Sequence, residues 1–187
     1  MNKTLLSAAL IAGFGVAAIA PQAAHAATST GTITITGAIA ASTCNVAVAG
    51  SVNPTVVLPT TMTNALATAG ATAGWTQMNL VLSACTVISP YTTVTPYLSG
   101  STIDTGTGYL KNATGSATNV EVALSTTNAL SGALTLQAAS GAQGLASTPL
   151  STSGSTTYTL WAGYVAQLTG ATAGSVATTV TYALNYQ

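Results

Sequence analysis

Charged side chains are almost absent from this chain. Only two of its 187 residues are Lys or Arg and two are Asp or Glu, which together make 2% of the sequence, whereas a typical globular protein has about 25%. A chain with so little positive charge cannot form the basic surface that nucleic-acid binding requires. Disordered chains are polar and charged, so a hydrophobic content of 48% argues against disorder. The composition predicts a folded protein with no nucleic-acid partner.

Groups that usually perform catalysis are also scarce. The single histidine, His25, lies in a segment that we expect to be removed, so the mature chain cannot form a Ser–His or Cys–His pair. Residues Asp104, Thr105 and Gly106 spell the triplet of aspartic proteases, but apolar residues do not lead into it as that motif requires. Asp and Gly favour a turn at such a position. We therefore expect no enzymatic activity and no cofactor.

Only one apolar run is long, and it lies at the N-terminus. Lys3 precedes an apolar core at residues 5–20, and residues 24–26 read Ala-His-Ala, a small-x-small cleavage site. The alternative, an N-terminal membrane anchor, is disfavoured by Pro21 and by this cleavage site. No later apolar run is long enough to cross a membrane. The sequence predicts a signal peptide at residues 1–26 and a mature chain that begins at Ala27.

Only two cysteines remain after the predicted signal, Cys44 and Cys85. Export places them in an oxidising compartment, where an even count favours a disulfide. The bridge would close a loop of about 40 residues, for which the chain-entropy model gives about 4 kcal/mol. Two buried thiols or a metal pair are the alternatives, although two thiols without histidine are too few ligands for a typical zinc site.

The residues that are abundant favour strands and turns. Thr and Val favour strands, while Gly and Ser favour turns. Residues 30–36 alternate strictly, with Gly31, Ile33 and Ile35 on one face. Residues 64–74 fit a loop or a short helical turn, and residues 141–155 fit a loop. We expect the other strands at residues 39–48, 56–58, 76–84, 91–98 (with Pro96 at an edge or bulge), 109–112, 119–124, 133–137, 157–168 and 175–187. Many short strands separated by turns predict an all-β sandwich.

The C-terminal stretch has the most regular alternation in the chain. An unpaired edge on such a strand would be an aggregation site, so the strand must pair with another segment. Its expected inward face consists of Val176, Thr178, Val180, Tyr182, Leu184 and Tyr186.

Several motifs together resemble a known family. Their order and spacing are more specific than any one of them, and together they cover nearly the whole mature chain. They are Gly-x-Ile-x-Ile-x-Gly at residues 31–37, Cys44, Leu-Ser-Ala-Cys at residues 82–85, residues 116–120, residues 164–167, Gly174 and the penultimate Tyr186. The chain resembles the major subunits of type 1-like pili, which are assembled by the chaperone–usher pathway.

This resemblance implies an immunoglobulin-like sandwich that lacks its last strand. The strand would be supplied first by a periplasmic chaperone and then by the N-terminal extension of the next identical subunit, in donor-strand exchange at an outer-membrane usher. Residues 27–37 would be the donor extension and residues 38–187 the pilin domain, exported through the periplasm into a surface fimbrium that supports attachment and biofilm formation. The donor residues would be Gly31, Ile33, Ile35 and Gly37. The acceptor groove and chaperone-recognition residues would be Gly174, Val176, Val180, Tyr182, Leu184 and Tyr186.

Two other functions fit the sequence. In a secreted carbohydrate-binding module, Trp75 and Trp161 would stack on sugars, although buried aromatic side chains in a sandwich core are more common. In a self-complemented or terminal pilus component, residues 30–36 would fold back onto their own domain. Asn112, Ala113 and Thr114 match the N-glycosylation pattern, which we attribute to chance.

Overall fold

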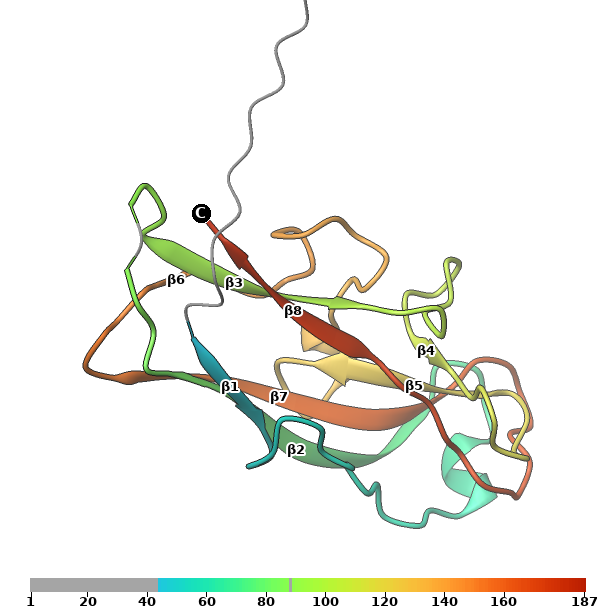
Figure 1. The fold of residues 1–187 in the computed structure, drawn as a ribbon. Helices are drawn as coiled ribbons and strands as arrows, with labels where there is room; N and C mark the ends of the chain where they lie inside the picture. The colour runs from blue at the N-terminus through green and yellow to red at the C-terminus, as the bar shows by residue number, and fades with distance from the viewer. Residues whose placement is uncertain (1–43, 88) are drawn as a thin grey trace, which may run out of the picture. The chain divides into compact units, whose positions relative to one another are not determined.

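The described residues, 44–87 and 89–187 of a computed structural model, belong to one structural unit spanning residues 39–187. Regular structure in this part is almost entirely β-strand, with two short 3₁₀ helices, η1 (Thr63–Leu66) and η2 (Leu130–Gly132). The strands (Figure 1) are β1 (Asn45–Val48), β2 (Thr72–Ser83), β3 (Thr93–Ser99), β4 (Leu110–Lys111), β5 (Val120–Ser125), β6 (Thr148–Pro149), β7 (Ser155–Ala166) and β8 (Thr181–Tyr186). The predicted signal peptide, the domain boundaries at residues 26 and 37, and the donor residues all lie outside the described residues.

The strands form two antiparallel sheets. The larger sheet has the order β1-β2-β7-β5-β4, and the smaller sheet has the order β6-β3-β8. The two longest strands, β2 and β7, pair along their length, with a register shift between Ala73 and Thr76. In Figure 1, β8 lies beside β3, in front of the larger sheet. Strand β8 is therefore an edge strand, because β3 is its only neighbour among the described strands.

One hydrophobic core fills the space between the sheets. Met78, Leu80 and Leu82 of β2 are 8%, 1% and 0% exposed, as the predicted alternation requires. Val94 and Leu98 of β3 belong to the same cluster of buried side chains. The prediction of an all-β sandwich is confirmed.

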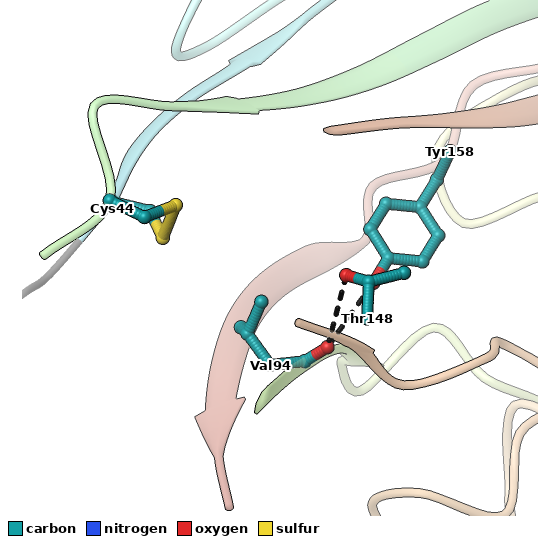
Figure 2. The surroundings of a disulfide bond; sticks show 5 residues. Cys44, Val94, Thr148 and Tyr158 are labelled. Carbon is teal, nitrogen blue, oxygen red and sulfur yellow. Dashed lines mark hydrogen bonds between the residues drawn. A yellow bond between two sulfur atoms is a disulfide. The ribbon is translucent and has the colours of Figure 1, made fainter. Parts of the chain in front are cut away.

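A polar contact joins the two sheets across this core. Tyr158 of β7 donates a hydrogen bond to the carbonyl of Val94, at 3.2 Å, and its hydroxyl lies 2.7 Å from the Thr148 hydroxyl (Figure 2). Burial raises the pKa of the Tyr158 phenol. Because a buried hydroxyl without a partner is costly, this pairing favours one arrangement of the two sheets.

Several predicted strands are shorter than expected or absent. Residues 56–58 are extended but pair with no strand, and residues 133–137 make a single bridge, between Ala133 and Ser125. Strand β8 begins at Thr181 rather than at residue 175. Each segment has an apolar pattern that favours a strand, but a strand also needs a neighbour for its backbone, which the sequence pattern does not reveal. Residues 141–155 contain the two-residue strand β6.

Pro96 lies in the middle strand of the smaller sheet, and yet the strand is an edge at that position. Strand β6 pairs only with Thr93 and Val94. Thr93 and Gln187 exchange both backbone hydrogen bonds, so alternation places Pro96 opposite Leu184 at a non-hydrogen-bonded pair. The missing N–H of Pro96 therefore points away from β8, past the end of β6, which explains why proline is tolerated there.

The two tryptophans are not core residues, contrary to the prediction. Leu160 and Ala162 face the core, so Trp161, between them in β7, points to the outer face of the larger sheet. Trp75 lies on the same face, because a Cβ on Gly163 would be 2.4 Å from its indole ring. Both indoles are partly buried. Residues 64–74, expected as a loop or a short helical turn, contain the last three residues of η1 and the start of β2.

No helix in the described ranges is long and apolar enough to span a membrane.

Candidate functional site

A groove runs beside the C-terminal segment of the chain. Its volume is about 620 Å³, and its floor is formed by core side chains of the larger sheet, among them Leu80, Val122 and Leu160. Its two sides are chain segments, which we call the N-terminal wall (residues 52–58) and the C-terminal wall (residues 176–182). The groove therefore opens the sandwich core to the surface between two segments that do not pair with each other.

A second hollow of about 460 Å³ continues the groove beyond Tyr164 and Val176, which border both spaces. Residues 60–63 and 171–176 line its sides. Burial raises the pKa of the Tyr164 phenol, and its ring lies 2.9 Å from the place where Gly74 would carry a Cβ. The aromatic ring of Tyr164 thus stands where the two hollows meet, with little room to move toward β2.

The C-terminal wall presents its backbone to the groove. The N–H of Ala177 donates to Asn112, and the carbonyls of Ala177 and Thr179 accept hydrogen bonds from residues 113–114 and from Thr102. Val176, Thr178 and Val180, which alternate with them, make no backbone hydrogen bond. Because adjacent residues of an extended chain direct these groups to opposite sides, the unused donors and acceptors point into the groove.

Side chains of the C-terminal wall are only partly covered. Val176, Val180 and Tyr182 pack against the core but are half-buried. The hydroxyl of Thr178 is buried and has no hydrogen-bond partner. This face is therefore the incompletely covered part of the core.

The N-terminal wall has the same character. Val56 and Leu58 pack against the core, while Val57 is 77% exposed. In the described structure, residues 53–61 make no backbone hydrogen bond. Tyr182 donates a hydrogen bond of 2.9 Å to the Val52 carbonyl, which joins the two walls at one end. The N-terminal wall was not predicted as part of the site, although its apolar run Val56 to Leu58, between Pro54 and Pro59, was a usable signal.

The predicted disulfide is present. Cys44 lies directly before β1 and Cys85 follows β2, their Cα atoms are 4.0 Å apart and their sulfurs are bonded (Figure 2). The alternatives of two thiols or a metal pair are thereby excluded. The bridge joins the ends of two adjacent strands of the larger sheet.

The other predicted site residues separate into three groups. The structure places Val176, Val180 and Tyr182 on the groove and Gly174 on the second hollow. Leu184 and Tyr186 lie farther along β8 and pack against the core. The predicted donor residues Gly31, Ile33, Ile35 and Gly37 lie outside the described residues.

Gly174 has a packing role of its own. A Cβ at this position would lie 2.5 Å from the Ala117 nitrogen and 2.7 Å from the Ser116 hydroxyl oxygen. Real Cβ atoms do not approach backbone so closely, so only glycine fits between the C-terminal segment and residues 116–117.

All charged side chains of the described residues gather away from the groove. The Lys111 ammonium lies 3.3 Å from Asp104, and Lys111 pairs in register with Glu121 on β5. Glu121 is 2% exposed and accepts a hydrogen bond from the Thr107 hydroxyl. Burial raises the pKa of Glu121, whereas the backbone N–H of Gly106 lowers that of Asp104. Within the described ranges, no group of three or more potential metal ligands occurs.

Comparisons with known proteins agree with a fibre subunit. Residues 33–187 match the family model described as fimbrial protein. The major fimbrial subunit SMF-1 of Stenotrophomonas maltophilia (strain K279a) is 38% identical over 176 residues, which cover 90% of this chain and 98% of the relative. The CupB6 tip adhesin of Pseudomonas aeruginosa overlaps 65% of this chain at 14% identity and a TM-score of 0.43, too slight a likeness to support a conclusion, and the chain spans about a third of its length (32%). The chain belongs to the fimbrial protein family and is a structural subunit of a fimbrium.

Proposed function

We propose that the groove receives residues 27–37 of a second copy of this chain, and that the protein polymerises into a fibre by this donor-strand exchange. The observation that carries the proposal is the row of unused backbone groups at Val176, Thr178 and Val180, facing an apolar groove. An added strand would satisfy these groups and cover the half-buried side chains at once.

The chemistry of the predicted donor segment suits this groove. Ile33 and Ile35 would each contribute about 1.5–3 kcal/mol if their side chains were fully covered. Gly31 and Gly37 carry no side chain, as a tight position in the groove would require, and the ring of Tyr164 makes such a position between the two hollows.

Length also supports the proposal. Residues 27–37 would extend over about 35 Å as a strand. The two sides of the combined groove, residues 52–63 and 171–182, contain twelve residues each, one more than the donor segment. A donor strand could therefore contact both sides along nearly their full length.

A subunit with an open groove needs other proteins to prevent its aggregation before assembly. An open core and an unpaired edge make the isolated subunit prone to aggregation. We propose that a periplasmic chaperone fills the groove first, with Gly174 and Tyr186 as recognition residues. An outer-membrane usher would then exchange it for the next subunit, giving an extracellular fimbrium that serves attachment and biofilm formation. A catalytic role has no place in this proposal.

Gel electrophoresis of the mature chain without boiling tests the proposal. We expect a ladder of multimers that resists detergent and collapses to one band on boiling. Deletion of residues 27–37 should abolish the ladder and leave chaperone binding intact, and the double variant I33S/I35S should weaken the ladder. A wild-type chain that runs as a single unboiled band and refolds reversibly alone would contradict the proposal. That result would favour a self-complemented or terminal component, or a carbohydrate-binding module.

A further inference from the structure

The C-terminal segment comprises residues 175–187, and its first half, residues 175–180, pairs with no strand. Strand β3 ends opposite Thr181, so residues 175–180 lie beyond the ladder. Their hydrogen bonds go instead to a loop of residues 112–117, which we call the clamp loop, and to the side chain of Thr102. This contact replaces the missing neighbour on the side away from the groove.

Asn112 makes most of this contact with one side chain. Its amide nitrogen donates to the carbonyls of Ala117, at 2.8 Å, and Ser175, at 3.1 Å. Its amide oxygen accepts hydrogen bonds from the N–H groups of Gly115, at 3.0 Å, and Ala177, at 2.8 Å. Two of the four bonds shape the clamp loop and two hold the C-terminal segment. The amide nitrogen to which an N-linked glycan would be attached thus donates two hydrogen bonds within the fold.

Close packing fixes the same contact. A Cβ on Gly115 would lie 2.2 Å from the Ser175 carbonyl oxygen and 2.3 Å from the Asn112 amide oxygen. The Ser116 and Ser175 side chains each accept a hydrogen bond from the other residue's N–H, at 3.1 and 3.0 Å. The clamp loop and the C-terminal segment therefore meet in one defined register, with Asn112 at its centre.

We infer that Asn112 is a positioning residue that holds residues 175–180 in the extended form before a donor strand arrives; this inference rests on the proposed function. Ordering a backbone residue is opposed by conformational entropy, and before the donor binds these residues are held by hydrogen bonds from the clamp loop and from Thr102. A donor strand can bind only the fraction of subunits whose wall is already extended. Asn112 raises that fraction, because it holds Ser175 and Ala177 against the clamp loop while Val176, Thr178 and Val180 face the groove.

A positioning role predicts an effect on association alone. Once the donor is in place, it pairs with Val176, Thr178 and Val180 and holds the wall itself. Replacing Asn112 with Ala removes the bonds to Ser175 and Ala177, and should slow donor association on the order of ten-fold. Dissociation of the bound donor should change little.

The test measures uptake of a fluorescent peptide with the sequence of residues 27–37 by freshly refolded, dilute mature chain, with the peptide in excess. Association is followed by anisotropy, and dissociation by chase with unlabelled peptide. Asn112→Asp keeps the acceptor for Gly115 and Ala177, but it loses the two donations and places a carboxylate oxygen against the carbonyls of Ala117 and Ser175. It should slow association at least as much as N112A, and it replaces N112A as the decisive variant if N112A does not fold.

Asn119→Ala is the matched control. Asn119 has a φ of +58° and donates to the carbonyls of Thr169 and Gly170, outside residues 175–180. N119A should lower stability and leave the association rate unchanged. Equal association rates for wild type, N112A and N112D would overturn the inference, and so would equal slowing by N119A. Failure of wild type to take up the peptide at all would instead reject the proposed function.

Discussion

Strand β7 and the C-terminal segment have the same apolar alternation and very different burial. Strand β7 pairs with β2 on one edge and β5 on the other, and its inward residues Tyr158, Leu160 and Ala162 are 8%, 1% and 5% exposed. The C-terminal segment pairs with β3 on one edge only, from Thr181 onward, and its six inward residues all remain half-buried. Alternation decides which side chains face the core, whereas neighbours on both edges decide whether the core there is closed.

The largest loss of stability should come from shortening a buried side chain of β7. Leu160→Ala should lower the free energy of unfolding of the isolated subunit by about 2–5 kcal/mol, because the leucine side chain is 1% exposed and its removal takes apolar contacts out of the core. Val180→Ala, in the open segment, should cost the isolated subunit about 1 kcal/mol or less, because its side chain is already partly in water. Urea unfolding of both variants measures the difference.

V180A should also affect the stability of the assembled multimers. V180A should reduce the temperature at which unboiled multimers dissociate, because the valine becomes covered only when a donor strand is present. Equal losses for L160A and V180A in the isolated subunit would mean that the groove is closed without a partner.

A smaller loss of stability should follow from adding a methyl group on the outer face of β7. Gly163→Ala places a methyl group 2.4 Å from the Trp75 ring, and overpacking of this kind costs about 1–3 kcal/mol. Gly154→Ala, just before β7, is the control, since its nearest atom is the Ser151 hydroxyl oxygen at 3.4 Å. Thermal unfolding should show a lower midpoint for G163A than for G154A. Similar midpoints would show that the indole can move aside freely.

The smallest effect concerns pH and the charge buried beside β7. Glu121 pairs in register with Val165, and burial raises its pKa above the usual 4.5. The folded state then binds the proton more tightly than the unfolded state, so stability is full below about pH 4.5 and falls as pH rises through the folded pKa.

Urea unfolding over a pH series measures how the free energy of unfolding depends on pH. Glu121→Gln should abolish the part of this dependence that comes from Glu121, while keeping an acceptor for Thr107. The lowered pKa of Asp104 acts in the opposite direction and at lower pH, below its usual value of 3.8. A wild-type slope equal to that of E121Q above pH 4.5 would contradict the account.

Much of the fold follows from local patterns. The stretches predicted at residues 76–84, 109–112, 119–124 and 157–168 correspond to β2, β4, β5 and β7. In these strands the apolar period agrees with the sheet that the chain forms, so a local signal and the tertiary pairing give the same answer. The Cys44–Cys85 bridge was predicted from the cysteine count and from the expectation of export.

The misses have a common cause. The pattern at residues 56–58 resembles that of a strand, and Asn112 resembles a glycosylation site, because neither periodicity nor a short motif reveals which distant segment lies alongside. The partners of Asn112 lie up to 65 residues away in the chain. Likewise, the alternation of Val120, Val122 and Leu124 does not reveal that Glu121 is 2% exposed and bound to the hydroxyl of Thr107, 14 residues away.

Residue types and their spacing are enough to predict the strand periods, the disulfide, the near absence of charge and the apolar face of the C-terminal segment. They do not predict that β8 is an edge, that residues 53–61 are unpaired or that Asn112 binds the opposite segment. These depend on which backbones become neighbours, and hydrogen bonding between chain segments distant in sequence is set by the whole packed sandwich.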